Sequence, residues 1–272
     1  MANPREKIAS CDPVWDRLRQ EAETIAEREP ALAGFVHAAI LKHARLENAL
    51  SYHMAGKLGG EDLSPLMVRE TFAEAMAADP EIGAALRADL SAVLDRDPAC
   101  HSIADALLYY KGFQALQSHR IAHWLWHRGR TAMALFFQSR ASMLFSVDIH
   151  PAARIGRGVM IDHGTGVVIG ETAVVEDDVS IMQDVTLGGT GKEAGDRHPK
   201  IRRGVLLSLG AKILGNIEIG EYSRVGAGSV VLKSVPAGCT AVGVPAKLIN
   251  CAGVARPSQE MNQMIDEQDN KI

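Results

Sequence analysis

The sequence lacks several features that would place it in a specialised class of protein. Aromatic residues make up only 5% of the 272 residues, and no apolar run reaches the ~18 residues of a membrane-spanning helix. The start, MANPREKIAS, has no apolar signal core, and the formal net charge is only −4. Neither a membrane nor a nucleic acid is therefore an expected partner, and we expect a cytoplasmic protein.

Cysteine is also scarce. The four cysteines lack the paired spacing that a structural zinc site or a disulfide framework needs, which predicts reduced, buried thiols. They are Cys11, Cys100, Cys239 and Cys251. With 47% hydrophobic and 23% charged residues, the composition is that of a globular protein long enough for two domains.

The second half of the chain carries an aliphatic residue at every sixth position. The series runs from Ile149 to Val185 and, after one interruption, from Ile201 to Ala237. A period of six fits neither an α-helix nor a simple alternating strand, and the strands of a β-sandwich, the main alternative, are irregularly spaced. Three hexads close one triangular coil of 18 residues, so the pattern predicts a parallel β-helix.

The interruption in the repeat predicts an extruded loop. Ten residues beyond a single hexad separate Val185 from Ile201, so residues 191–200 should leave the coil. The loop carries Arg197 and His198, and loops on rigid scaffolds often hold functional residues. The arginine suits a bidentate pair with a substrate carboxylate, although a salt-bridged surface turn is compatible with the same residues.

A second polar cluster lies at the start of the repeat. His163 follows Asp148 by 15 residues. Because residues 18 apart stack between coils, we expect the imidazole to lie near the carboxylate, one level up. An imidazole oriented by a carboxylate can remove a proton from a hydroxyl group. A solvated His–Asp pair in a turn is the less specific interpretation, and we keep that interpretation for His150.

Residues 1–147 show helical periodicity and helix-start signals. Ser64-Pro65 and Asp79-Pro80 are each an N-cap and first-turn pair followed by apolar residues at helical spacing. Most aromatic residues lie in the last third of this region, as is typical of a core or a subunit interface. The predicted domains are a helical cap and oligomerisation domain (1–147), a β-helix (148–249) and a flexible tail (250–272).

Taken together, these motifs resemble a known family. The chain is similar to the bacterial serine acetyltransferases, which are hexapeptide-repeat acyltransferases, in its motifs DIHPAA, DH, GGTGK and DRHPKIR, behind the segment LLYYKGFQALQSHRIAHWLW. The resemblance implies an α+β fold in which an all-α domain precedes a left-handed parallel β-helix. It also implies metal-free transfer of acetyl from acetyl-CoA to the L-serine hydroxyl, which gives O-acetyl-L-serine for cysteine biosynthesis.

The resemblance also implies roles for individual residues. His163 would be the general base and Asp148 its orienting partner. Leu209 departs from the family, because a small residue is usual at this point of the cofactor track. The other implied contacts are Asp97 and Asp162 with the serine ammonium, Arg197 with its carboxylate, His198 with the substrate, and Gly189, Gly210, Ala227 and Lys247 with acetyl-CoA between the subunits of a trimer.

Partners follow from the same resemblance. L-cysteine would compete with serine as a feedback inhibitor, and trimers would pair into hexamers through the helical domains. The terminal Ile272 would enter the active site of O-acetylserine sulfhydrylase.

Three other functions stay open from the residues alone. One is a zinc hydrolyase of the carbonic-anhydrase-like hexapeptide type, with His150, His163 and His198 as ligands. Another is an acetyltransferase for a different small acceptor, and the last is a non-catalytic scaffold.

Overall fold

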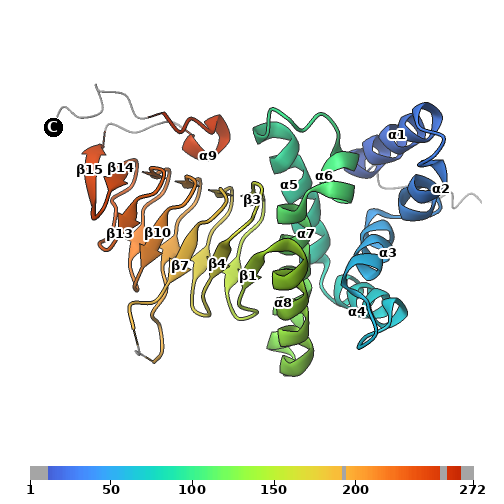
Figure 1. Cartoon of the computed structure of the whole chain (residues 1–272), viewed down its shortest axis with the longest axis horizontal. Helices are drawn as coiled ribbons and strands as arrows, with labels where there is room; N and C mark the ends of the chain where they lie inside the picture. The colour runs from blue at the N-terminus through green and yellow to red at the C-terminus, as the bar shows by residue number, and fades with distance from the viewer. Residues whose placement is uncertain (1–11, 192–193, 252–255, 265–272) are drawn as a thin grey trace, which may run out of the picture.

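The computed structural model describes residues 12–191, 194–251 and 256–264. A helical domain and a parallel β-solenoid stand side by side, with α8 (Thr131–Phe145) leading directly into β1 (Val147–Ile149) (Figure 1). The predicted order of an all-α domain followed by a hexapeptide coil is thereby confirmed. No helix in the described part of the chain is long and apolar enough to cross a membrane.

The helices of the first domain begin where the capping signals predict. Ser64 and Asp79 each accept a backbone N–H from the first turn, and proline occupies the first position of both helices. The helix that follows Arg45 was not predicted. The helices are α1 (Pro13–Arg28), α2 (Ala33–Val36), the π-helical η1 (His37–Leu41), α3 (Leu46–Leu58), α4 (Pro65–Ala78), α5 (Pro80–Arg96), α6 (Ile103–Tyr109), α7 (Lys111–His127) and α8.

Helix α7 forms the centre of the helical domain. It is buried on nearly all its faces, so its polar side chains need internal partners. Arg120 donates to both carboxylate oxygens of the fully buried Asp89, at 2.8 and 3.0 Å, and Gln117 donates to the same group at 2.9 Å. Helix α7 is continuous through Ser118, and the break between α6 and α7 lies at Tyr110.

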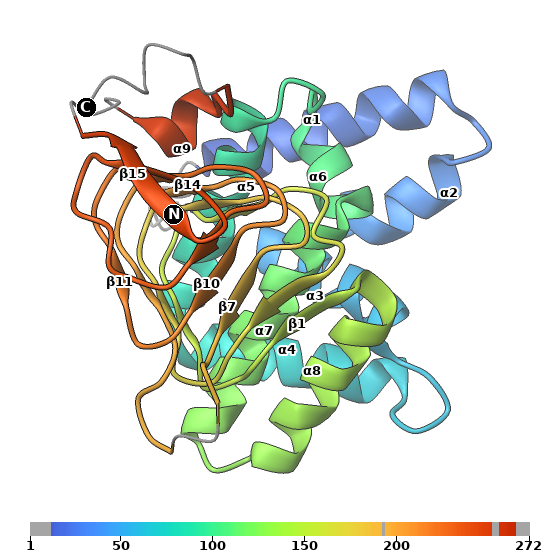
Figure 2. The same ribbon diagram turned by 60° about the vertical axis from the view of Figure 1, so that its left-hand side comes forward.

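The solenoid consists of three parallel sheets whose strands recur once per coil (Figure 2). The first sheet contains β1, β4 (Val167–Ile169), β7 (Thr186–Gly188), β10 (Lys212–Leu214) and β13 (Val230–Val231). The second contains β2 (Arg154–Ile155), β5 (Val174–Val175), β8 (Lys200–Ile201) and β11 (Glu218–Ile219). The third contains β3 (Met160–Ile161), β6 (Ser180–Ile181), β9 (Leu206–Leu207), β12 (Arg224–Val225), β14 (Thr240–Gly243) and the antiparallel β15 (Ala246–Asn250).

The six-residue register holds with two corrections. Ile149 pairs with Ile169, so the first coil contains two residues more than the expected 18, and the extra residues lie in the turn after Ile161. At the other end, Val235 rather than Ala237 pairs with Ile219, and Ala237 is exposed. Ile149 therefore stacks on Ile169 and Leu187 rather than on Val167 and Val185, and the predicted hexad series is wrong by two residues between Ile161 and Ile201.

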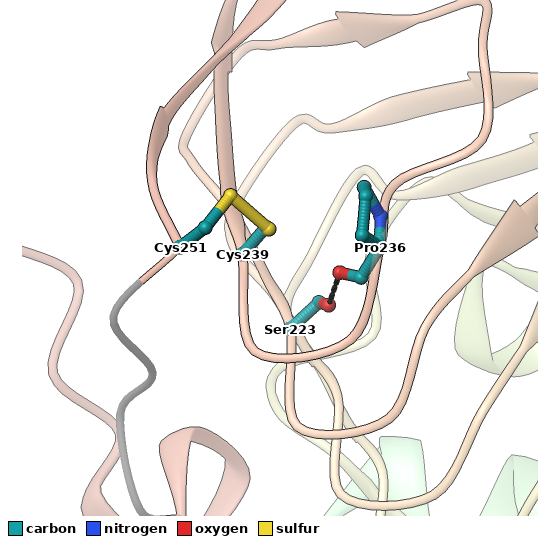
Figure 3. The surroundings of a disulfide bond; sticks show 4 residues. All are labelled: Ser223, Pro236, Cys239 and Cys251. Atoms are coloured by element: carbon teal, nitrogen blue, oxygen red, sulfur yellow. Dashed lines mark hydrogen bonds between the residues drawn. A yellow bond between two sulfur atoms is a disulfide. The ribbon is translucent and has the colours of Figure 1, made fainter. Parts of the chain in front are cut away.

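The cysteine prediction was wrong for one pair. A disulfide joins Cys239, just before β14, to Cys251, just after β15 (Figure 3). These strands form an antiparallel hairpin in which Thr240 pairs with Asn250, and a hairpin brings together cysteines that have no recognisable spacing in the sequence. Cys100 is free and buried, as expected, and Cys11 lies outside the described residues.

Candidate active site

Polar residues gather at two edges of the triangular solenoid, where turns connect neighbouring sheets. The acid edge comprises the turns from the third sheet to the first, residues 162–166, 182–185, 208–211 and 226–229. The loop edge comprises the turns from the first sheet to the second, residues 150–153, 170–173 and 189–199. Parallel stacking places each set of turns in one column, so residues distant in sequence become neighbours.

The acid edge begins with Asp162 and His163. The His163 backbone is left-handed, with φ +53°, and its side chain is 71% exposed. Its Nε2 atom lies 3.9 Å from Asp162 Oδ1. Two glycines with positive φ, Gly164 and Gly166, complete the turn, which is the turn that contains the two extra residues of the first coil. The irregularity of the repeat therefore presents the imidazole to solvent.

Asp97 joins Asp162 from the helical domain. Both carboxylates line a cavity of 610 Å³ between the end of α5 and the third sheet. Burial raises the pKa of Asp162, and the negative charge of Asp97 raises it further, while the neighbouring His163 opposes the shift. The lining contains four carboxylates, Asp95, Asp97, Asp162 and Glu260, and one basic residue, Arg96, so the cavity favours a cation.

Asp148 lies on β1 with its carboxylate directed toward α8. Gln138 Nε2 donates to Asp148 Oδ1 at 2.7 Å. The expected stacking on His163 does not follow the register, because Asp148 pairs with Val168. No hydrogen bond or ion pair joins Asp148 to His163 within the described residues, so their proposed partnership stays a prediction.

The loop edge holds the basic cluster. Arg197 Nη2 donates to Glu171 Oε2 at 2.7 Å, and the Thr172 backbone N–H donates to His198 Nδ1 at 3.1 Å. His198 is 7% exposed, and its ring lies so close to Gly170 that a Cβ at that position would overlap it. Burial lowers the pKa of His198, and the charge of Arg197 lowers it further. The predicted loop residues are therefore prearranged on their own coil.

The two edges do not meet within one chain. No contact among the described residues links the Asp97, Asp162 and His163 group to Arg197 or His198. The same separation contradicts the three-histidine zinc hypothesis. His150 and His198 lie on the loop edge, whereas His163 lies on the acid edge. The parts of the chain that the structure describes contain no group of three potential metal ligands.

The residues predicted to contact acetyl-CoA are divided among three places. Gly210 and Ala227 stack on the acid edge, where Gly228 N donates to Leu209 O at 2.8 Å and Leu209 is 42% exposed. Gly189 lies on the loop edge against Arg197. Lys247 is exposed on β15. An extended cofactor on the acid edge would pass Leu209 directly.

Sequence reasoning missed one wall of the cavity. Residues 256–264, which we call the C-terminal strap, return to the solenoid and include the short helix α9 (Pro257–Glu260). The strap residues that line the cavity with Asp97 and Asp162 are Gln259, Glu260, Met261 and Gln263. Pro257 was the only local signal, as a residue that favours a first helical turn. Ile272 lies outside the described residues.

Comparison with known proteins identifies the family. The family model described as "Serine acetyltransferase, N-terminal" matches residues 14–118. The serine acetyltransferase of Salmonella typhimurium is 56% identical over 250 residues, which cover 92% of each chain. The chain belongs to the serine acetyltransferase family. The resemblance inferred from DIHPAA, GGTGK and DRHPKIR is therefore confirmed.

Solved structures of this family agree closely in fold. A serine acetyltransferase in complex with cysteine aligns with a TM-score of 0.92 and 52% identity, covering 93% of this chain and 99% of that one. A serine acetyltransferase from Brucella abortus in complex with coenzyme A gives 0.87 and 54%, covering 88% and 96%. The soybean enzyme complexed with serine gives 0.85 and 54%, covering 87% and 97%.

Proposed function

We propose that the protein transfers acetyl from acetyl-CoA to the hydroxyl of L-serine, giving O-acetyl-L-serine and CoA. The observation that carries this proposal is the pair Asp97 and Asp162, which face one cavity beside an exposed imidazole. Two carboxylates suit an ammonium group, and a nearby base suits a hydroxyl on the same small molecule. Family members in complex with serine, coenzyme A and cysteine support this choice of ligands.

His163 acts as the general base in this proposal. A serine hydroxyl is a weak nucleophile at neutral pH, and a positioned base that removes its proton contributes typically ~10²–10⁴-fold to the rate. The oxygen then attacks the thioester carbonyl, the C–S bond breaks, and the CoA thiolate receives a proton. Asp148, held by Gln138, orients the imidazole and stabilises its protonated form.

Arg197 and His198 serve the same substrate from a neighbouring subunit. Arg197 would bind the serine carboxylate, and His198 would pack against the substrate. The division of the site between two edges supports a trimer in which the loop edge of one subunit faces the acid edge of the next. Acetyl-CoA then lies in the groove between subunits, along Gly210 and Ala227, with Gly189 and Lys247 at its borders.

One assay tests the activity directly. Loss of the acetyl-CoA thioester is measured with L-serine and, in parallel, with other hydroxyl and amine acceptors. We expect L-serine to be the preferred acceptor and His163→Ala to lower kcat by at least ~10²-fold without changing the oligomeric state. His127→Ala, which alters an exposed histidine on α7, is the matched control. Near-normal turnover by His163→Ala would remove this residue from its role.

Regulation and partners complete the proposal. L-cysteine, a near-isostere of serine, should compete with serine at this cavity, and steady-state kinetics without such competition would contradict the assignment. The trimers would pair into hexamers through the helical domains. The terminal Ile272 would occupy the active site of O-acetylserine sulfhydrylase, and unchanged affinity for that enzyme after deletion of Ile272 would oppose this role.

A further inference from the structure

The C-terminal strap covers the proposed acceptor cavity through few contacts. Helix α9 lies beside α5, above the solenoid (Figure 1). Ser180 Oγ donates to Ser258 O at 2.7 Å, and Arg224 Nη1 donates to the carbonyl oxygens of Asn262 and Met264 at 3.0 and 2.9 Å. Pro257 and Ser258 are buried. The strap is thus anchored at its two ends, while its middle forms a wall of the cavity.

The docked strap also contains an unfavourable feature. Gln263 Oε1 is buried and has no hydrogen-bond partner among the described residues. A buried acceptor without a partner costs about 1–3 kcal/mol, which offsets much of what the anchoring hydrogen bonds contribute. The docked state is therefore weaker than its hydrogen bonds alone suggest, and it depends on how near the strap is held by the rest of the chain.

The disulfide sets that proximity. Cys251 precedes the strap by only a few residues, and its bond to Cys239 attaches it to the last coil (Figure 3). Without this bond, the attachment is the β14–β15 hairpin, whose register is irregular between Thr240 and Ala241. Fraying of β15 back to Ala246 would roughly double the number of residues between the last fixed residue and the strap.

We propose that the Cys239–Cys251 disulfide is a thiol–disulfide switch that holds the strap over the acceptor cavity, so that the oxidised protein is the less active form. Substrate must enter a cavity of which the strap is one wall, and the acid edge that would hold acetyl-CoA lies next to the sheet on which the strap docks. The inference rests on the proposed acetyl transfer.

The switching chemistry is a two-electron exchange with a dithiol reductant. Cys251 is exposed, whereas Cys239 is 2% exposed, so the incoming thiolate attacks Sγ of Cys251 and Cys239 leaves as a thiolate. The second thiol of the reductant then releases Cys251. Two protons and two electrons pass from the dithiol to the protein, which gains two thiols, while the reductant becomes a disulfide. The reverse exchange restores the bond.

The expected effect follows from the length of the tether. Effective concentration falls as about the −3/2 power of linker length, so doubling the number of linking residues should weaken docking about threefold. We expect reduction to raise kcat/KM for L-serine by up to about threefold, the limit that is reached when the strap of the oxidised protein is almost always docked. Residues 256–264 should also exchange their amide hydrogens faster in the reduced protein, because the docked state becomes less populated.

The experiment compares full-length protein equilibrated with oxidised or reduced dithiothreitol. Activity is followed by loss of the thioester itself, because thiol reagents would react with the reductant, and hydrogen exchange is measured by mass spectrometry. Cys251→Ser should match the reduced protein in both buffers. Ser258→Lys, which prevents burial at this position, should be fully active in both buffers although the disulfide still forms. Cys11→Ser is the matched control and should retain the redox response.

Several outcomes would overturn the proposal. These are equal activity and equal exchange in the two redox states, a redox response that survives in Cys251→Ser, and one that disappears in Cys11→Ser. Lower activity on reduction would show that the docked strap assists the reaction, which contradicts the assignment. If neither redox state transfers acetyl, the proposed function fails, and strap exchange still tests the switch separately.

Discussion

The two edges of the solenoid present different charged groups and differ in how those charges are satisfied. On the acid edge, Asp97 and Asp162 line a cavity in which carboxylates outnumber the basic residue Arg96, and burial together with the charge of Asp97 raises the pKa of Asp162. On the loop edge, Arg197 is already paired with Glu171 at 2.7 Å. The acid edge therefore has an excess of carboxylates, whereas the arginine of the loop edge already has a carboxylate partner.

This difference assigns separate tasks to the two edges. An amino-acid zwitterion brings an ammonium group, which relieves the repulsion between the two acids, and a carboxylate, which must compete with Glu171 for Arg197. At the acid edge, binding relieves an existing repulsion and so gains free energy directly. At the loop edge, binding replaces one ion pair by another. The acid edge should thus contribute most of the affinity, and the loop edge orientation.

The largest predicted effect comes from mixing two variants that are each nearly inactive when L-serine is kept at or below its wild-type KM. If the edges of neighbouring subunits form each site, His163→Ala and Arg197→Ala should complement each other at this serine concentration when they are unfolded and refolded together. Random assembly leaves one site in four with both residues intact, so the mixture should recover about a quarter of the wild-type activity. Each variant refolded alone is the control, and activity no greater than the mean of the two would show that each chain forms its own site.

Arg197→Ala alone should act mainly on serine binding. Loss of a charge-assisted interaction of about 1.5–3 kcal/mol predicts a KM for L-serine roughly 10- to 100-fold higher, with little change in KM for acetyl-CoA. The KM of Arg197→Lys for L-serine should lie between those of the wild type and Arg197→Ala, because lysine keeps the charge without the bidentate geometry. Glu171→Gln should act in the opposite direction. An unchanged KM for serine in Arg197→Ala would separate the loop edge from the acceptor.

Gln138→Leu tests whether the amide positions Asp148. The substitution removes the 2.7 Å hydrogen bond to Asp148 Oδ1, and we expect kcat to fall about tenfold with KM for acetyl-CoA unchanged. The pH profile of kcat should shift as well, since the carboxylate would support the imidazole less well. Ser139→Ala, on an exposed neighbouring position of α8, is the control. Loss of thermal stability without a change in kcat would indicate a purely structural role.

The smallest change is a displacement of the acid limb of the pH profile in Asp97→Asn, which accompanies the higher KM for L-serine expected from the loss of one of the two carboxylates. Asp162 must be ionised to hold an ammonium group, and the charge of Asp97 raises its pKa. Removing that charge lowers the pKa of Asp162, so kcat/KM for serine should decline at a lower pH than in the wild type. Glu70→Gln, at an exposed position of α4, serves as the control. An acid limb that stays in place in Asp97→Asn would assign that limb to a group other than Asp162.

The sequence predicted the scaffold well because the scaffold repeats. The aliphatic residues from Ile149 onward predict the coil, and the extra residues before Ile201 predict the loop that carries Arg197 and His198. Capping residues such as Ser64 and Asp79 gave the helix starts. These signals are local or periodic, so they can be read from the sequence without knowing which segments are in contact.

The features that escaped prediction depend on contacts between distant segments or on irregularity. The extra residues after Ile161 changed the register, so counting in steps of 18 gave the wrong strand partner for Asp148, which pairs with Val168. The bond between Cys239 and Cys251 required the β14–β15 hairpin, and the docking of the strap on Ser180 had no periodic signal. The separation of the two edges also required coordinates, because sequence spacing does not show which corner a turn occupies.

The left-handed backbone at His163 has a consequence for protein design. A bulky residue with positive φ is less stable there than glycine, by about 1 kcal/mol, so a search for stabilising substitutions would select His163→Gly early. That variant would form a more stable β-helix but, under the proposed mechanism, it would be inactive. Stability screens of this protein should therefore exclude position 163, where an optimal scaffold and a working catalyst require different residues.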